Sequence, residues 1–183
     1  TAERVTYQNV FKQHLGCDPL TSTLAEIQNL ASQYGHAELA AKESNKDTLL
    51  MLLFSQHIEP QIGQDRPCFV LDFPASQAAL AKISATNPLV AERFELYFQG
   101  IELANGFHEL TDGAEQLKRF EQDNIKRKNV GLEMMPIDQN FIAAINAGLP
   151  ACAGVALGID RLLMLAFNCS SIDQVIAFEN SRA

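Results

Sequence analysis

Apolar residues recur at helical spacing in the first third of the chain, and this pattern predicts a group of helices. Residues 6–15 form the first predicted helix, which ends at Gly16. Thr23 opens a capping box in front of a second helix, and Asp47 is expected to cap a third. We interpret the stretch at about 6–60 as a helical insertion into a single domain.

Alternation with a period of two takes over in the middle of the chain, where it predicts strands. Residues 68–72 form one predicted strand, and the residues from Arg93 to about Glu109 have the pattern of a β-hairpin. The remaining predicted elements are a polar helix capped by Asp112 and reaching about Lys128, a helix at 138–147 closed by Gly148, and a strand at 154–157. This order predicts an α+β fold with a mostly antiparallel sheet flanked by helices.

The predicted hairpin contains two glutamates that can share one face of the sheet. A two-residue turn at Gln99 and Gly100 pairs Tyr97 with Glu102 and makes Glu95 a diagonal neighbour of Glu102. Two carboxylates on a half-buried face repel each other unless a cation lies between them. A magnesium site that carries ATP phosphates is one interpretation, and a solvated polar face is the other.

Further along the hairpin, uninterrupted alternation would place Glu109 on the side opposite to Glu102. Asn105 and Gly106 suggest a bulge, since one extra residue there would return Phe107 and Glu109 to the face of Glu102. A carboxylate beside an aromatic wall is suited to receive the ammonium group of a substrate.

The segment 154–166 reads as a strand that runs into a helix. Gly158 lies at the junction, and four apolar residues follow at the spacing of one buried helical face: Ile159, Leu162, Leu163 and Ala166. Such a junction directs free backbone N–H groups at a ligand, and Arg161 in the first turn adds a forked cationic donor. The pattern indicates phosphate binding, although a surface ion pair between Asp160 and Arg161 explains it as well.

Together, Gly-x-Glu-x-x-Asn-Gly-Phe-x-Glu-Leu at 100–110 and Gly-x-x-x-Gly-x-Asp-Arg-Leu at 154–162 resemble the C-terminal half of the catalytic domain of class II lysyl-tRNA synthetases. The resemblance extends from about Tyr7 to the last residue. It implies a two-step acyl transfer in which ATP activates the lysine carboxylate as an adenylate. It also implies Mg²⁺ as a cofactor and a homodimer as the assembly of the full-length protein.

The resemblance assigns roles by matched position. ATP would be bound by Glu95, Glu102, Leu103, Gly158 and Arg161, with Mg²⁺ held by Glu95 and Glu102. Lysine would be bound by Asn105, Phe107, Glu109 and Ala156. Arg161 would be the catalytic residue, because it would hold the terminal phosphates as charge develops. Catalysis of this kind depends on positioning and electrostatics.

Three details resemble a branch of this family that attaches β-lysine to a lysine of translation elongation factor P. His108 stands where the family usually has serine, and Ala156 stands where it usually has glycine. The sequence of residues 73–80 is also similar to that of this branch. The added methyl group could discriminate β-lysine from lysine by ~1–3 kcal/mol, or it could simply pack as well as glycine. His108 is a candidate contact for the acceptor or the lysine.

Two alternatives remain open: a true lysyl-tRNA synthetase that charges tRNA, and a lysine-binding regulatory protein without catalysis. Nothing in the chain matches the first and second motifs of the family. We therefore expect 1–183 to be the C-terminal portion of a catalytic domain whose N-terminal part carries those motifs. On its own it is expected to form no adenylate.

Composition adds limits on partners and compartment. The formal net charge of the 183 residues is −8, which argues against a broad nucleic-acid surface and favours a protein acceptor over tRNA. The basic cluster 126–128 is interpreted as a solvated helix end. Four cysteines without close pairs, and no apolar run long enough for a membrane, suggest a cytoplasmic protein.

Overall fold

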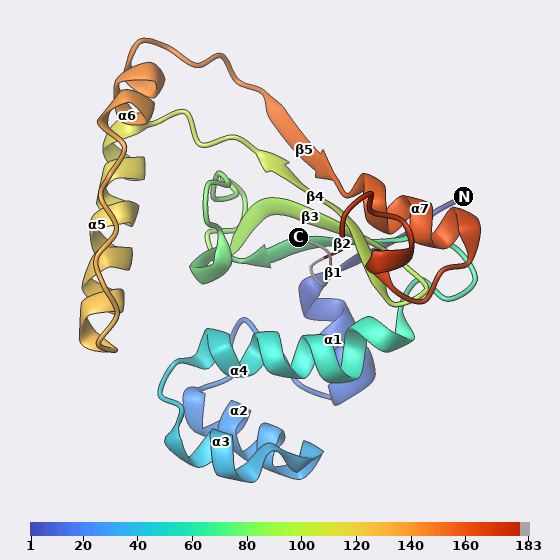
Figure 1. The fold of residues 1–183 in the computed structure, drawn as a ribbon. Coiled ribbons are helices and arrows are strands. Elements are labelled where there is room, and N and C mark those ends of the chain that lie inside the picture. Colours follow the sequence, from blue (N-terminus) through green and yellow to red (C-terminus); the bar gives the residue numbers. More distant parts are fainter. Residues whose placement is uncertain (180–183) are drawn as a thin grey trace.

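A five-stranded sheet forms the centre of the computed structural model, which describes residues 1–179 (Figure 1). The strands are β1 (Glu3–Thr6), β2 (Cys68–Pro74), β3 (Val90–Phe98), β4 (Ile101–His108) and β5 (Ala153–Leu157). They lie side by side in chain order. β1 and β2 are parallel, and the other three pairs are antiparallel. The prediction of a mostly antiparallel sheet is confirmed, although β1 was not anticipated.

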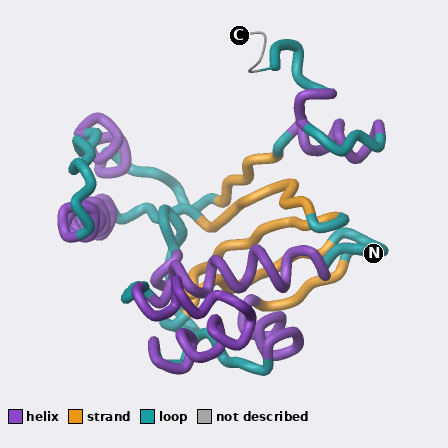
Figure 2. Tube along the Cα trace, turned by 60° about the horizontal axis from the view of Figure 1, so that its bottom comes forward, coloured by secondary structure: helices purple, strands orange, loops and turns teal. Residues whose placement is uncertain are grey.

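Helices lie on one face of the sheet and beyond both ends of β5. They are α1 (Tyr7–Leu15), α2 (Leu24–Ala31), α3 (Ala37–Lys42), α4 (Lys46–Leu53), α5 (Gly113–Asn129), α6 (Gln139–Asn146) and α7 (Ile159–Phe167). Five shorter helical turns complete them: η1 (Ser32–His36), η2 (Phe54–Ile58), η3 (Glu59–Gln61), η4 (Ala75–Gln77) and η5 (Ile172–Gln174). Figure 2 shows the N-terminal helices below the sheet, with α5 and α6 on one side and α7 on the other.

Most of the predicted helix ends are correct. Thr6 caps α1, Gly16 ends it with a left-handed backbone, and the capping box at Thr23 is formed with Glu26. Asp112 caps α5. The third helix is different, because the side chain of Asn45 accepts the N–H of Asp47 and is therefore the cap. Asp47 lies in the first turn instead, where a negative charge still complements the helix dipole.

The main hydrophobic core lies between these N-terminal helices and strands β2 and β3. Its fully buried members are mostly large side chains from α1, α2, α4 and η2: Tyr7, Val10, Phe11, Ile27, Leu49, Leu50, Leu53 and Ile58. Cys68, Val70 and Tyr97 contribute from the sheet. The predicted helical insertion thus supplies one wall of the core, and it covers only the β1–β3 half of that sheet face (Figure 2).

The hairpin of β3 and β4 has the predicted turn. Tyr97 pairs with Glu102 and Phe98 with Ile101, and both turn residues have positive φ angles, 51° at Gln99 and 72° at Gly100. Two positive φ angles are the signature of a type I′ turn, whose twist matches that of the strands. Glycine at the second position removes the steric cost there.

The bulge that realigns β4 is present, but not where it was predicted. Leu96 pairs with Ala104 and Tyr97 with Glu102, so the extra residue is Leu103. Gly106 is not the bulge residue, and its lack of a side chain instead allows β4 to pack closely against its surroundings. A Cβ added to it would lie 2.6 Å from the Phe94 ring and 2.7 Å from the Gly154 carbonyl oxygen. The expected consequence still holds, since Phe107 returns to the face of Glu102.

The C-terminal strand and helix are formed as predicted, with Gly158 between them. The expected burial of the apolar face of α7 is wrong: Ile159 is 58% exposed, and Leu162 and Ala166 are exposed as well. In the part of the chain that the structure describes, no element covers this face. Among residues 1–179, no helix combines the length and apolar character needed to cross a membrane.

Candidate active site on the open half of the sheet

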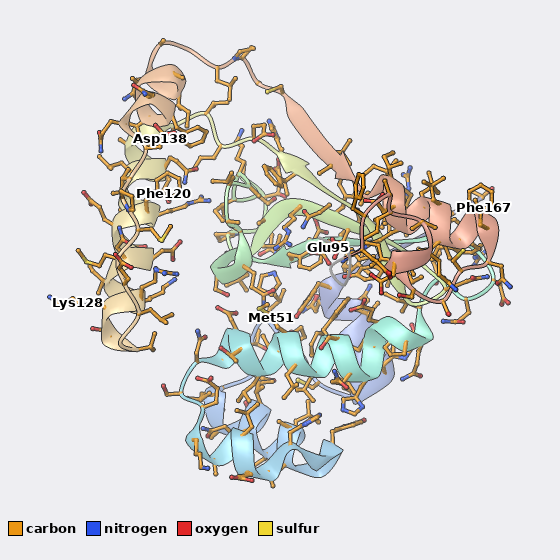
Figure 3. All side chains as sticks on the ribbon, in the orientation of Figure 1. Met51, Glu95, Phe120, Lys128, Asp138 and Phe167 are labelled. Atoms are coloured by element: carbon orange, nitrogen blue, oxygen red, sulfur yellow. The ribbon has the colours of Figure 1, made fainter. Side chains whose placement is uncertain are left out.

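Strands β3, β4 and β5 bring most of the predicted site residues onto one face of the sheet. Register places Glu95 opposite Asn105, and Asn105 opposite Ala156. Tyr97, Glu102 and Phe107 share this face, because paired residues point to the same side and alternate residues repeat it. Figure 3 marks Glu95 on the sheet between the N-terminal helices, where Met51 lies, and α7, where Phe167 lies.

Glu95 is the buried anchor of this face. Its Oε1 accepts a hydrogen bond of 2.5 Å from Arg93 and one of 3.3 Å from the Asn105 amide, and its Oε2 accepts the hydroxyl of Tyr97. Burial raises the pKa of Glu95, the Tyr97 hydroxyl and the Arg93 charge oppose that rise, and the Glu102 charge adds to it. Burial likewise raises the pKa of Tyr97, so its hydroxyl remains a donor.

Arg161 holds Glu102, a contact that the sequence analysis did not predict. The Arg161 guanidinium donates to the Glu102 carbonyl oxygen at 2.7 Å and lies 3.3 Å from its carboxylate. The N–H of Gly158 donates to the carbonyl of Leu103 at 2.8 Å. The start of α7 is therefore fixed to the bulge of β4, and all five residues assigned to ATP lie on neighbouring positions of β3, β4 and α7.

A third carboxylate, Glu59 in η3, was missed in the sequence. It lines a cleft of about 450 Å³ together with Glu95, Arg93 and Tyr97. Burial raises the pKa of Glu59, and the charges of Glu102 and Glu95 raise it further. Because η3 ends at Gln61 and the hairpin begins only at Val90, no local pattern connects Glu59 with the two glutamates of the sheet.

The donor set fits Mg²⁺ in its chemistry. Hard cations prefer carboxylate oxygens, and Mg²⁺ in proteins is commonly held by one or two carboxylates plus substrate phosphates. Glu95 and Glu102 supply two such groups, and each raises the electrostatic cost of ionising a neighbouring carboxylate. Within residues 1–179 there is no cluster of three or more ligating side chains. The site therefore suits a metal ion whose coordination is completed by substrate phosphates, and not one held by protein side chains alone.

The residues assigned to the amino acid lie further along β4 and β5. Phe107 pairs with Gly154, and Asn105 with Ala156, so these residues form a strip on the same face. A Cβ added to Gly154 would lie 2.5 Å from Oε1 of Glu109, which shows that the Glu109 carboxylate leans over this glycine. The strip thus carries an aromatic wall, an amide and a carboxylate.

His108 does not belong to this strip. It alternates with Phe107 and therefore points to the opposite face of the sheet, where its Nδ1 lies 2.6 Å from Glu92. The suggestion that His108 contacts the acceptor or lysine through this face is not supported. His108 lies between two candidate site residues in the sequence, but consecutive side chains of a strand point to opposite faces of the sheet.

The segment after β2 closes the other side of the cleft. Asp47 accepts hydrogen bonds from Ser76 at 2.8 Å and from Gln77 at 3.2 Å, which connects η4 to the start of α4. Both Ser76 and Gln77 line the cleft with Glu95. Arg93 and Tyr97 were also missed, although their spacing of two from Glu95 was a signal that they share its face.

Comparison with known proteins agrees with these motifs. Residues 2–182 match the family described as tRNA synthetases class II (D, K and N). The chain belongs to this family. It is 58% identical over 178 residues to the elongation factor P–(R)-β-lysine ligase of Vibrio vulnificus, an alignment that covers 97% of this chain and 55% of that protein.

Two other relatives carry the same name. The Vibrio cholerae ligase is 58% identical over 183 residues and the Klebsiella pneumoniae ligase (strain MGH 78578) 54% identical over 182, each alignment covering all of this chain and 56% of the relative. The chain thus spans about half the length of the curated relatives that it matches. Membership of the class II synthetase family confirms the fold class expected from the sequence.

Proposed function

We propose that the protein to which this chain belongs activates (R)-β-lysine with ATP and transfers it to a lysine side chain of elongation factor P. The observation that carries this proposal is the shared sheet face, on which two carboxylates and Arg161 adjoin an amino-acid strip. The names of the relatives, elongation factor P–(R)-β-lysine ligases, support this pair of substrates. Composition favours a protein acceptor as well, because the chain has a net charge of −8.

In this proposal, ATP with Mg²⁺ supplies the adenylyl group that activates the amino-acid carboxylate. Glu95 and Glu102 would hold the metal, and Leu103 and Gly158 would line the nucleotide with their backbones. Arg161 would stabilise the terminal phosphates with its guanidinium, which already lies against Glu102. These groups act by position and charge, so no side chain of this face needs to move a proton.

The amino acid would bind along the strip of β4 and β5. Glu109 would pair with the ammonium of its side chain, and Asn105 and Phe107 would set its orientation. Ala156 faces the same side as Asn105, so its methyl group would limit where the amino and carboxyl groups can lie. This position supports a role for Ala156 in the choice between β-lysine and lysine.

The intact mass of elongation factor P tests the proposal. The full-length protein would be incubated with ATP, elongation factor P and (R)-β-lysine, with lysine and with tRNA as comparison substrates. We expect the mass to rise by one β-lysyl unit and tRNA to stay uncharged. Charging of tRNA would establish a lysyl-tRNA synthetase instead, and ATP binding without any turnover would establish a lysine-binding regulatory protein.

The 183 residues alone are expected to show no amino-acid-dependent pyrophosphate exchange, because nothing in them matches the first and second motifs of the family, which the resemblance associates with the dimer interface and with binding of the α-phosphate. Exchange by this chain would contradict that expectation. We further propose a homodimer as the assembly of the full-length protein, which rests on the family resemblance, and the cytoplasm as its location, which rests on the composition of the chain.

A further inference from the structure

Arg93 has contacts that its position in β3 alone does not explain. Its guanidinium donates to Glu95 Oε1 at 2.5 Å, to the carbonyl oxygen of Gln77 at 2.9 Å and to Oδ1 of Asn105 at 3.4 Å. It also lies 4.6 Å from the centre of the Phe73 ring. Only 17% of the side chain is exposed. One partly buried cation thus joins three different segments.

The three hydrogen-bond partners belong to different parts of the proposed site. Glu95 is a proposed metal and ATP ligand, Asn105 is a proposed amino-acid ligand, and Gln77 lies in the η4 segment that lines the cleft. A guanidinium has five N–H donors in a fixed planar fork, so it can hold several acceptors at set angles. A lysine ammonium keeps the charge but not this geometry.

The η4 segment depends on such contacts for its position. Side chains of Ser76 and Gln77 connect it to Asp47 of α4, while Arg93 holds its backbone from the sheet side. Further along, Arg119 of α5 donates to the carbonyl oxygens of Ala79 at 3.1 Å and Ala81 at 2.8 Å. Arg93 and Arg119 therefore hold one segment from two sides, but only Arg93 also contacts proposed ligands.

We propose that Arg93 is a positioning residue that couples the amino-acid pocket to the ATP carboxylates. It fixes the Glu95 carboxylate, the Asn105 amide and the η4 backbone relative to one another before substrates bind. This inference rests on the proposed function. It predicts that ATP and the amino acid favour each other's binding, and that the coupling requires the fork of Arg93 and not its charge alone.

Arg93→Lys in the full-length protein tests the inference, and Arg119→Lys is the matched control. Arg119 is equally buried, with 15% of its side chain exposed, and it also binds two backbone carbonyls, but it contacts no proposed ligand. Calorimetry would give the dissociation constant of (R)-β-lysine without nucleotide and with Mg²⁺ and the α,β-methylene analogue AMPCPP, whose α–β linkage cannot be cleaved in adenylate formation. Pyrophosphate exchange would give KM and kcat.

We expect Arg93→Lys to weaken amino-acid binding by about 10-fold to 100-fold, to raise its KM, and to remove the dependence on the ATP analogue, while thermal unfolding stays close to that of the parent. Arg119→Lys should leave the dissociation constant, KM and coupling unchanged. Arg93→Gln is the second variant if the first does not fold, since its amide cannot reach Glu95 and Gln77 together.

Unchanged affinity and coupling in a folded Arg93 variant would overturn the inference. An equal loss in Arg119→Lys would also overturn it, because general loosening of the η4 segment would then be the cause. The proposed function is judged separately on the parent protein. If the parent neither binds (R)-β-lysine nor exchanges pyrophosphate, the proposed function fails, whereas an active parent with unaffected Arg93 variants removes only the role of Arg93.

Discussion

At the scale of single residues, the candidate site is governed by the pairing of charges. Each sheet carboxylate assigned to the metal has its own arginine, Arg93 for Glu95 and Arg161 for Glu102. A buried carboxylate without such a partner would be costly to ionise. The charge of Arg93 therefore offsets part of the cost of ionising the buried Glu95.

Glu109 offers a direct test of the amino-acid strip. If its carboxylate pairs with a buried substrate ammonium, Glu109→Gln in the full-length protein should cost ~2–5 kcal/mol of binding free energy, because the ammonium would lose its counter-charge. Calorimetric titration with lysine and (R)-β-lysine would measure this. Glu92→Gln is the control, since Glu92 pairs with His108 on the opposite face. Unchanged affinity in Glu109→Gln would remove this residue from the site.

Gly106 is predicted to be intolerant of a side chain. The methyl group of Gly106→Ala would enter the space of the Phe94 ring and of the Gly154 carbonyl, so β4 and β5 must separate. We expect a loss of about 1–3 kcal/mol in the free energy of unfolding, measured with urea. Gly158→Ala should keep its stability, because only side-chain carbons of Arg161 lie near, at 3.5 Å and beyond. Equal stability of the two variants would contradict this account.

At the scale of elements, β5 and α7 form an apolar edge of the described structure. Val155 is 64% exposed on β5, and the apolar residues of α7 are exposed beside it. β5 is also the last strand of the sheet, so one row of its backbone groups is unpaired there. Unpaired sheet edges and exposed apolar patches favour association with other polypeptide chains.

We therefore expect the 183-residue chain to self-associate with rising concentration through this edge. Val155→Lys should reduce the association, since a charge on an edge strand disfavours pairing with another strand. Val155 points away from Ala156 and the site face, so the change spares the proposed ligands. Sedimentation velocity would report the species present. Met51→Lys, at a position on α4 that is 61% exposed, should leave the association as it is.

At the scale of the whole molecule, carboxylates from distant parts of the chain converge. Glu59 comes from the end of the helical insertion, whereas Glu95 and Glu102 come from the hairpin. Burial and the charges of Glu102 and Glu95 raise the pKa of Glu59 above its ordinary value of 4.5. The folded protein therefore binds more protons than the unfolded chain just above pH 4.5. The contribution of Glu59 to the free energy of unfolding therefore falls as the pH rises through the range just above 4.5.

Glu59→Gln removes this unfavourable charge. The variant should melt at a higher temperature than the parent at pH 7, and at the same temperature near pH 4, where the carboxyl group is protonated in both states. Differential scanning calorimetry at the two pH values measures the difference. Glu38→Gln, which removes an exposed carboxylate beside Lys42, should give no such gain at pH 7. A lower melting temperature for Glu59→Gln at pH 7 would contradict the repulsion.

Local features of this protein could be predicted from the order of its residues. Within residues 1–179, periodicity and capping residues located six of the seven α-helices and four of the five strands, because these signals act within a few residues. The hairpin turn and the shared face of Glu95 and Glu102 also followed from local rules. The apolar pattern of 154–166 predicted the strand β5 and the helix α7, with Arg161 in the first turn of that helix.

Features that depend on distant segments became visible in the folded protein. It moved the bulge to Leu103, because Gly106 must pack against Phe94 and Gly154, and it left the apolar side of α7 exposed. It also brought Glu59 to the hairpin and Gln77 to Arg93. The physical reason is common to all of these. Packing and electrostatics act between residues that are close in space, and the sequence does not show which distant residues become neighbours.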